Sequence, residues 1–441
     1  MLLHFPVSPP CMRRIIHWLA VGILVPCAES SPAHAADGEC ALPPPPPLSL
    51  FVAEKRLSDC NRDVMAARLA VAAAEADLRT ASQRPNPTLT VEASNVNPSA
   101  GIGAGPLRGK TFDSSARIDQ LVERGNKAEL RVAQAQASLD ASRADVAEQL
   151  RQQRLAMRTA FFDLAAAQER VRLQLEFRDL STQSADASSQ RMKAGEVSRA
   201  EANRFRLDAA RAANDARQAQ SDRERSRLDL AKLLGMESAA ATLDVSVEWP
   251  HGADGPAAKG DRPDVAAAKL RVDAALAGRA LARSIATRDV TLGLQADHWP
   301  TNEFNQQGTG ISYTFSVSVP LQVRHANEGE AARGAADFET AKAAFARAQA
   351  AAESEAKLAE TDWRAAEERR ERVEAEVRPL ARDVAQAAEF AYARGATGVL
   401  DLLDARRSLK AVELDEVQAS ADSAKAWARR EASREIFETS P

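Results

Sequence analysis

The sequence predicts a mainly α-helical fold with a membrane β portion, in which one unit of long helical hairpins and two β-strands occurs twice. The first observation is that the chain from Asn126 to Ala194 contains no Gly or Pro and is rich in strong helix formers. At 1.5 Å per residue, a helix of this length reaches roughly 100 Å. Because no compact core is that long, we expect a rod that turns at Gly195 and returns as far as Gly235, forming a helical hairpin.

The second observation is an internal repeat. Residues 63–67 (Asp-Val-Met-Ala-Ala) resemble residues 264–268 (Asp-Val-Ala-Ala-Ala), which lie 201 positions later. Ala194-Gly195 likewise corresponds to Arg394-Gly395, 200 positions later. This period is far longer than that of a solenoid repeat and indicates two structural halves. We therefore expect a second hairpin that turns at residues 394–399.

The third observation is the alternation of apolar and polar residues in four segments. These are Thr88–Val96, Thr111–Glu123, Asp289–Trp299 and Ile311–Val323. Strands of roughly ten alternating residues are typical of transmembrane β-barrels. Four strands cannot close a barrel, since even small barrels need about eight. We therefore expect three copies to combine into a 12-stranded β-barrel that stands on an α-helical barrel.

The remaining elements follow from local signals. Residues 42–48 are expected to form an extended polyproline lead, followed by a helix from Ser49 to Ser82 with Ser49 as its N-cap. A strand is expected at Thr242–Val247, between the two halves. Residues that step by three and four predict packed coiled-coil seams along the long helices. They are Ala133, Ala137, Ala141, Ala144 and Ala147 in the first half, and Phe338, Ala341, Phe345, Ala348 and Ala352 in the second.

The N-terminus carries an export signal. Arg13-Arg14, the apolar run Ile15–Val25 and a small-residue site predict a secretory signal peptide that is cleaved between Ala35 and Ala36. A transmembrane anchor is the alternative, but the apolar run is too short to span a bilayer.

The mature chain keeps two cysteines, Cys40 and Cys60. In an oxidising compartment a nearby pair is expected to form a disulfide, with two free thiols as the alternative. Neither Cys27 nor Cys40 lies in a good lipidation site.

Charge and composition exclude several classes of function. The net charge of −4 gives no basic footprint for nucleic acid. The histidines of the mature chain, His251, His298 and His325, lie far apart, and none has a Cys or His at metal-ligand spacing. We therefore predict no metal site, no cofactor and no catalytic constellation, so the chain is not expected to be an enzyme.

Two motifs carry a resemblance to a known family. Residues 84–87 (Arg-Pro-Asn-Pro) run into a strand, and residues 121–127 (Leu-Val-Glu-Arg-Gly-Asn-Lys) open the first long helix. With the duplication and the element order, they make the whole mature chain resemble the outer membrane factor family of TolC-like outer-membrane efflux channels. Residues 121–127 are particularly similar to the CzcC-like branch, which serves cobalt-zinc-cadmium cation efflux.

The resemblance implies a homotrimeric channel in the outer membrane of a Gram-negative bacterium that extends into the periplasm. It implies two protein partners, a periplasmic adaptor (membrane fusion) protein and an inner-membrane proton-driven pump of the RND type, and heavy-metal cations as the exported substrate. A periplasmic adaptor or coiled-coil scaffold, and an outer-membrane channel for drugs or organic compounds, are the alternatives. An adaptor has one hairpin, however, whereas this chain is predicted to have two.

If the strands lie in the membrane and long helices lead away from them, the hairpin turns lie at the far end, where a partner can reach them. Simple turn chemistry is the alternative for any one residue. The predicted adaptor-docking residues are Gly195, Glu196, Val197, Gly395, Ala396, Thr397, Gly398 and Val399. The expected organisation is a signal peptide at 1–35, an extended segment at 36–48, a first repeat at 49–235, an equatorial segment at 236–262, a second repeat at 263–437 and a tail at 438–441.

Overall fold

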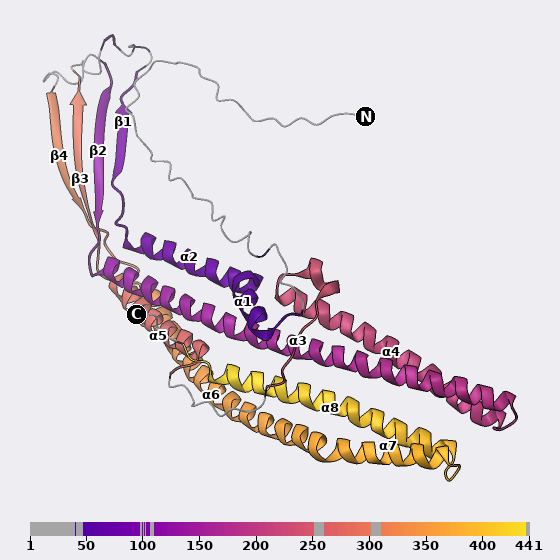
Figure 1. Ribbon diagram of the computed structural model, residues 1–441. Helices are drawn as coiled ribbons and strands as arrows, with labels where there is room; N and C mark the ends of the chain where they lie inside the picture. The colour runs from indigo at the N-terminus through magenta and orange to yellow at the C-terminus, as the bar shows by residue number, and fades with distance from the viewer. Residues whose placement is uncertain are drawn as a thin grey trace, which may run out of the picture.

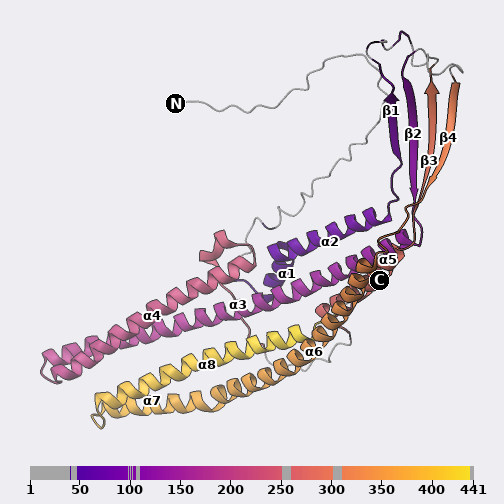
Figure 2. The same ribbon diagram turned by 180° about the vertical axis from the view of Figure 1, so that it is seen from behind.

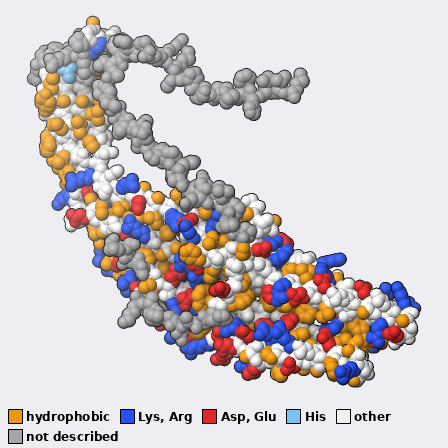
Figure 3. Space-filling model, viewed as in Figure 1, with side chains coloured by type: hydrophobic (Ala, Val, Ile, Leu, Met, Phe, Trp, Pro, Cys, Tyr) orange, Lys and Arg blue, Asp and Glu red, His pale blue; other side chains and the backbone are white. Residues whose placement is uncertain are grey.

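A computed structural model describes residues 40, 47–97, 99, 101, 103–105, 110–250, 260–300 and 310–437. A four-stranded sheet forms one end of the molecule, and two helical hairpins extend away from it to the other end (Figures 1 and 2). Hydrophobic side chains cover much of the visible face of the sheet, whereas charged side chains of both signs are spread over the helices (Figure 3).

The two halves have the same element order. The first half contains α1 (Leu50–Cys60), α2 (Arg62–Ser82), β1 (Thr88–Ser94), β2 (Asp113–Val122), α3 (Lys127–Lys193) and α4 (Arg199–Leu233). A short 3-10 helix, η2 (Glu237–Thr242), follows. The second half contains α5 (Pro263–Ser284), β3 (Val290–Trp299), β4 (Gly310–Ser318), α6 (Glu328–Arg372), the π-helical turn η3 (Val373–Val377), α7 (Arg378–Ala393) and α8 (Val399–Arg434). The prediction of a mainly helical fold with a small β portion is confirmed.

The helix predicted from Ser49 to Ser82 is wrong in one respect, because it is two helices that are separated at Asn61. Asn61 is extended, with φ −71° and ψ 127°, and its side chain accepts hydrogen bonds from the N–H groups of Asp63 and Val64. Its amide also donates to the carbonyl of Leu233 at 2.8 Å. Asn is a favoured N-cap residue, and here this capping outweighs the high helix propensity of the flanking residues.

Two predicted strands also differ from the structure. The fourth strand ends at Ser318 rather than Val323, because Pro320 has no N–H to donate to the ladder. The strand expected at Thr242–Val247 does not form. Instead, η2 ends at Thr242, and Val245 makes an isolated parallel bridge with Leu48.

The second hairpin is interrupted where α6 passes into α7. The π-helical turn η3 lies directly before Pro379, the second residue of α7. Proline has no N–H, and its ring clashes with the carbonyl of the residue four positions earlier, here Ala375. A π turn at that point relieves the clash while the chain remains helical.

The largest hydrophobic cluster lies halfway along the molecule, where α1, α3, α4, η2 and α8 meet. It includes Leu57, Met157, Phe161, Phe162, Leu164, Leu230, Leu234, Ala424 and Ala428, all buried. Of the predicted first seam, Ala141 and Ala144 are buried, Ala137 and Ala147 are half-buried and Ala133 is exposed. All five predicted positions of the second seam are half-buried. The small side chains of these seams allow α3 and α6 to approach their neighbours closely.

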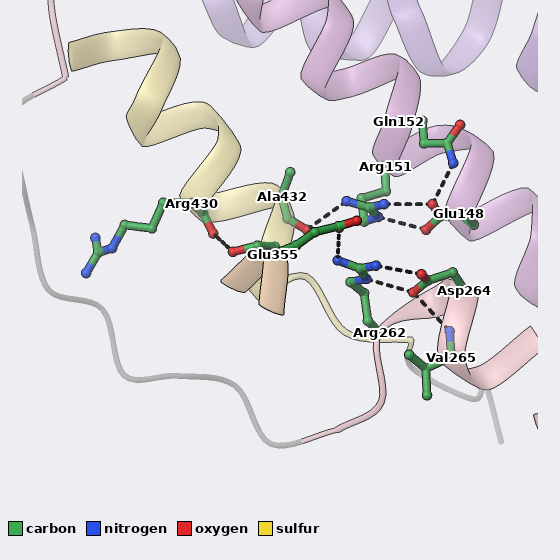
Figure 4. Close-up of polar contacts among 10 residues, drawn as sticks. Glu148, Arg151, Gln152, Arg262, Asp264, Val265, Glu355, Arg430 and Ala432 are labelled. Carbon is green, nitrogen blue, oxygen red and sulfur yellow. Dashed lines mark hydrogen bonds and ion pairs between the residues drawn. The ribbon is translucent and has the colours of Figure 1, made fainter. Parts of the chain in front are cut away.

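A cluster of buried charges joins the two halves near the end of α8 (Figure 4). The Arg262 guanidinium donates to both carboxylate oxygens of Asp264, at 2.7 and 2.6 Å, and to Glu355 at 2.7 Å. Arg151, from the first half, donates to the carbonyl of Ala432 at 3.2 Å. The side chains of Arg262 and Arg151 are only 6% and 10% exposed. Strong charge-assisted bonds therefore hold α3, α5, α6 and α8 together.

The N-terminal segment is fastened to the same region of the fold. A disulfide joins Cys40 to Cys60, and Arg56 donates to the carbonyls of Cys40 and Leu234. Replacing both cysteines with serine is expected to lower the free energy of unfolding by about 3 kcal/mol, because the bond closes a loop of 20 residues in the unfolded chain. Denaturant titration measures this loss. Two reactive thiols in the denatured, unreduced protein would contradict the bridge.

Candidate channel wall and docking tips

The sheet brings the two halves of the chain together edge to edge. Its four strands are antiparallel in the order β1-β2-β3-β4, so that β2 of the first half pairs with β3 of the second. Side chains alternate between the two faces of a sheet. The register therefore sorts every strand residue onto one of two faces.

One face is apolar. A row of residues paired across all four strands consists of Leu89, Ile118, Leu294 and Phe315. The row beside it consists of Val91, Ala116, Ala296 and Tyr313. Several of these side chains are largely exposed, including Phe315 at 69% and Tyr313 at 74%. A contiguous exposed apolar face flanked by polar residues indicates a membrane or partner surface.

The other face is polar, and an ion pair on β2 is hydrogen-bonded across it to β4. The Arg117 guanidinium binds the Asp119 carboxylate at 2.8 Å and donates to the hydroxyl of Ser316 at 3.3 Å. These side chains lie over Gly293 of β3, where an added Cβ would approach Asp119 Oδ1 to 2.6 Å. Because glycine has no side chain, Gly293 leaves room for Arg117 of β2 to reach Ser316 of β4 across β3.

The polar face carries excess negative charge. Its carboxylates are Glu92, Asp113, Asp119 and Asp297, and the single arginine in the four strands, Arg117, is bound to Asp119. Within the described residues, Glu92, Asp113 and Asp297 have no cationic partner within 4.0 Å. Glu92 and Asp297 also share one row of the sheet, with Ser115 between them.

The two hairpin turns lie at the end of the molecule opposite the sheet (Figures 1 and 2). Each begins with a glycine at positive φ, Gly195 at 79° and Gly395 at 72°. The N–H of Glu196 donates to the carbonyl of Arg191, and the N–H of Ala396 to that of Ala391. These six-to-one hydrogen bonds are Schellman motifs, which require a left-handed residue and so favour glycine.

The predicted docking residues are not equally exposed. Gly195, Glu196, Gly395, Ala396 and Gly398 are exposed, and Val197 and Thr397 are half-buried. Val399, in contrast, is buried in a small tip core that also contains Ala185, Phe205, Leu402 and Leu403. The Tyr392 hydroxyl donates to Glu201 at 3.0 Å beside this core, linking the two hairpins. Val399 therefore contributes to packing rather than to the tip surface.

Known proteins share both the sequence pattern and this architecture. Residues 256–430 match the family model described as outer membrane efflux protein. The cobalt-zinc-cadmium resistance protein CzcC of Cupriavidus metallidurans is 24% identical over 410 residues, which cover 90% of this chain and 94% of CzcC. The outer membrane channel CmeC of Campylobacter jejuni superposes with a TM-score of 0.75 at 14% identity, covering 87% of this chain and 85% of CmeC.

A membrane protein from Pseudomonas aeruginosa gives a TM-score of 0.74 at 17% identity, covering 88% of this chain and 90% of the other. With the family match, these likenesses confirm the predicted resemblance. Residues 256–430 belong to the outer membrane efflux protein family, and the chain as a whole has the fold of outer-membrane channels.

This family also confirms the predicted location in the outer membrane. Its members are transport channels, so the prediction that the chain is not an enzyme is confirmed as well. Among the residues that the structure describes, no helix is both long and apolar enough to cross a membrane.

The structure places the other predicted site residues as follows. The cleavage site, Ala35 and Ala36, and also His251, lie outside the described residues. His298 lies on β3, and His325 precedes α6 with Glu330 at 3.7 Å. In the described part of the efflux channel, no three His, Cys, Asp or Glu side chains are grouped so that they could hold a metal ion.

Sequence reasoning did not single out the carboxylates of the polar face. Glu92, Asp113 and Asp297 lie in strands that were predicted, and their position within the alternation assigns each of them to the polar face. Their gathering on one surface, however, depends on the β2–β3 register, which joins residues more than 160 positions apart. No local pattern in the sequence encodes that register.

The assignment of the apolar face can be tested by placing a charge on it. Leu292→Arg or Phe315→Arg in the efflux channel is expected to cost about 2–4 kcal/mol if the position lies near the bilayer midplane. The heat-resistant trimer recovered from the outer-membrane fraction should fall accordingly. Thr314→Arg is the matched control, because Thr314 precedes Phe315 and belongs to the polar face. Equal yields from Phe315→Arg and Thr314→Arg would contradict the assignment.

Proposed function

We propose that three copies of this chain form the outer-membrane channel of a tripartite, proton-driven RND-type system that exports heavy-metal cations. A periplasmic adaptor protein would join the channel to the inner-membrane pump. In this proposal residues 1–35 are removed during export, and residues 49–235 and 263–437 act as equivalent structural repeats around the equatorial segment 236–262.

The open edges of the sheet support a trimer. The strand order leaves β1 and β4 at the two edges, each with one unpaired side among the described strands. In a bilayer, unpaired backbone N–H and C=O groups cost several kcal/mol each, so a membrane sheet must close on itself. Four strands from each of three copies make twelve, which is enough to close a barrel.

The acidic polar face is the observation that carries the cation proposal. In the closed barrel the apolar face meets lipid, and the polar face lines the channel. Each copy brings Glu92, Asp113 and Asp297 to that lining without a cationic partner among the described residues. Rings of carboxylates raise the local concentration of cations and repel anions. Because the carboxylates are not grouped as a tight metal site, the channel would let the ion pass rather than retain it.

The name of CzcC adds a second line of support. That relative is a cobalt-zinc-cadmium resistance protein, and its match extends over 90% of this chain. Divalent cations of this kind are the substrates on which the carboxylate lining would act. No comparable feature of the described polar face favours an organic substrate.

Ion selectivity in planar bilayers tests the proposal. The reconstituted trimer in a KCl gradient should give a zero-current potential of cation-selective sign, because the lining is acidic. The triple variant Glu92→Gln, Asp113→Asn, Asp297→Asn should move this potential toward zero. Asp337→Asn, on the exposed surface of α6, is the control and should leave it unchanged. Anion selectivity of the unmodified channel would rule the cation proposal out.

A deletion strain tests the exported substrate directly. Cells that lack the chain should become sensitive to cobalt, zinc or cadmium, and a plasmid copy should restore resistance. Unchanged metal tolerance combined with new sensitivity to organic compounds would instead favour a channel for organic substrates.

Docking of the adaptor at the tips gives a separate prediction. Gly398 has an ordinary φ of −81°, and an added Cβ would meet only Asp401 Oδ2 at 4.0 Å, so the fold does not require glycine there. Gly398→Trp should therefore leave trimers intact but abolish crosslinking to the adaptor, because a bulky side chain blocks close approach. Gly398→Ala should crosslink normally. Normal crosslinking of Gly398→Trp would mean that the partner binds elsewhere.

A further inference from the structure

A row of arginines marks the boundary between the sheet and the helices. Arg84 precedes β1, Arg124 follows β2, Arg288 precedes β3 and Arg324 follows β4. All four are exposed, and within the described part of the chain none has a carboxylate within ion-pair distance of 4.0 Å. Figure 3 shows basic side chains at the end of the sheet that adjoins the helices. Every strand thus has an arginine close to its helix-side end.

Two carboxylates at this boundary, Asp289 and Glu123, are bound to other cations. Asp289 accepts a hydrogen bond from Lys127 Nζ at 2.8 Å, and Glu123 accepts one from Arg131 Nη2 at 2.9 Å. Asp289 also accepts the backbone N–H of Arg124 at 2.9 Å. The side chain of Lys127 is only 10% exposed, which places this pair inside the fold. Among the described residues, the arginine side chains of the boundary are thus left without an ion-pair partner.

Arg124 and Arg288 are also cross-strand neighbours. Val122 pairs with Val290, and the same register continued by two residues places Arg124 opposite Arg288. The two segments are still adjacent there, because a Cβ added to Gly125 would approach Thr287 Cβ to 2.8 Å. Like charges placed opposite one another destabilise a sheet. A bound anion between the two guanidinium groups would remove that cost.

Strand pairing with a second copy of the chain does not place an anion here. Arg124 and Arg288 belong to the central strands β2 and β3, whereas a neighbouring copy would add its strands at β1 or β4. Side chains two residues apart on a strand lie on the same face. Arg124 and Arg288 lie two residues from Val122 and Val290, and so continue the apolar face. Immediately beyond the apolar face is the level at which lipid headgroups lie.

A groove beside this pair offers room for a headgroup. Its lining includes Arg84, Pro85, Gln120 and Arg124, together with the carboxylates of Glu123 and Glu129. Gln120 Nε2 donates to the carbonyl of Pro85 at 3.0 Å, which holds the segment before β1 against β2. Two arginines are therefore presented at one groove on the rim of the apolar face.

The groove measures about 740 Å³, which lies within the range of roughly 300–1,000 Å³ that ligand sites occupy in proteins. This volume is large enough for a phosphate group together with the glycerol next to it.

We propose that Arg84, Arg124 and Arg288 bind the phosphate groups of anionic phospholipids in the periplasmic leaflet of the outer membrane. The proposal rests on the proposed membrane position of the sheet. The planar guanidinium groups match the oxygens of a phosphate and bind them through paired hydrogen bonds. Such contacts would fix the height of the barrel in the membrane, because they hold the end of the apolar face at the headgroup level.

The lipid preference of the intact trimer tests this proposal. The purified trimer is mixed with nanodiscs or vesicles that contain phosphatidylglycerol, and with matched samples of phosphatidylethanolamine alone, and bound lipid is counted by native mass spectrometry. The unmodified trimer should retain phosphatidylglycerol preferentially. Arg124→Gln with Arg288→Gln should weaken that retention by roughly 30-fold, since each basic residue near an anionic surface contributes about a factor of five.

Arg204→Gln with Arg347→Gln is the matched control. Both residues are exposed on helices away from the strand ends, and neither has an ion pair among the described residues. This control should retain phosphatidylglycerol as the unmodified trimer does. Equal loss in both double variants would mean that only the total charge matters, and would overturn the assignment of the site.

Inorganic phosphate distinguishes a lipid site from an ion site. If 50 mM phosphate, a concentration chosen for the assay, displaced phosphatidylglycerol completely, the arginines would bind free phosphate and the lipid proposal would be wrong. A trimer that inserts into the membrane but shows no lipid preference would overturn this inference alone. A chain that does not insert in any lipid would instead overturn the proposed function.

Discussion

Phe162→Ala is expected to lower the free energy of unfolding by about 3–5 kcal/mol, because it removes the centre of an aromatic cluster and leaves a cavity. Phe162 is 1% exposed. Its ring lies 5.8 Å from that of Phe161, 6.2 Å from Trp249 and 6.5 Å from Trp427. These rings come from α3, from the segment between the repeats and from α8, so the cavity would open where the two halves of the chain meet.

Denaturant titration of the purified protein in detergent measures this loss. Phe162→Leu is the graded control, because it keeps most of the buried apolar volume and should cost clearly less. Phe51→Ala removes a phenyl ring that is 78% exposed in the single chain and should change stability by only about 0.5 kcal/mol. A loss for Phe162→Ala no larger than that for Phe51→Ala would show that the cluster does not hold the halves together.

Much of the fold could be predicted because its signals are local. Gly195 and Gly395 interrupt long helical runs, and both turns lie at these glycines with positive φ. The first strand begins at Thr88 and the third ends at Trp299, as the alternation predicts. Glycine, proline and periodicity act over a few residues, so a single sequence is enough to read them.

The deviations have equally local causes that compete with the pattern. Asn61 caps a new helix within a sequence of strong helix formers. Pro320 ends the pairing of β4 although apolar residues continue to Val323. In each case one side chain or one missing N–H outweighs the propensity of its neighbours.

The polar face and the buried charge cluster could not be predicted, because both depend on contacts between distant segments. Arg262 and Asp264 are close in sequence, but Glu355 reaches them from α6, 93 positions beyond Arg262. Likewise, Glu92 and Asp297 share a row only through the pairing of β1, β2 and β3. Tertiary packing, which one sequence does not reveal, decides which charges meet.

Arg262→Met is expected to cost about 3–5 kcal/mol at neutral pH, because removing one partner leaves a buried charge uncompensated. The Arg262 side chain is 6% exposed, and that of Asp264 is 25% exposed. Without the guanidinium, the Asp264 carboxylate keeps a hydrogen bond from the N–H of Val265, at 2.9 Å. The double variant Arg262→Met, Asp264→Asn removes both charges and should recover most of the loss.

The same prediction has a defined pH dependence. Burial alone would raise the pKa of the Asp264 carboxyl, but the hydrogen bonds and charge of Arg262, the N–H of Val265 and the charge of Arg151 together more than offset it and hold the pKa below its ordinary value. This stabilisation is therefore present above the ordinary carboxyl pKa and is lost as the pH falls through the lowered value. In Arg262→Met the contributions of Arg262 are lost while burial remains, so the pKa of Asp264 rises and its protonation relieves the uncompensated charge at a higher pH. The difference in unfolding free energy between the unmodified protein and Arg262→Met should consequently be largest near pH 7 and should shrink on acidification. The difference between the unmodified protein and the double variant should narrow less, because only the unmodified protein's own loss contributes to it. A difference between the unmodified protein and Arg262→Met that stayed constant down to pH 3 would mean that Asp264 is not the group whose charge Arg262 compensates.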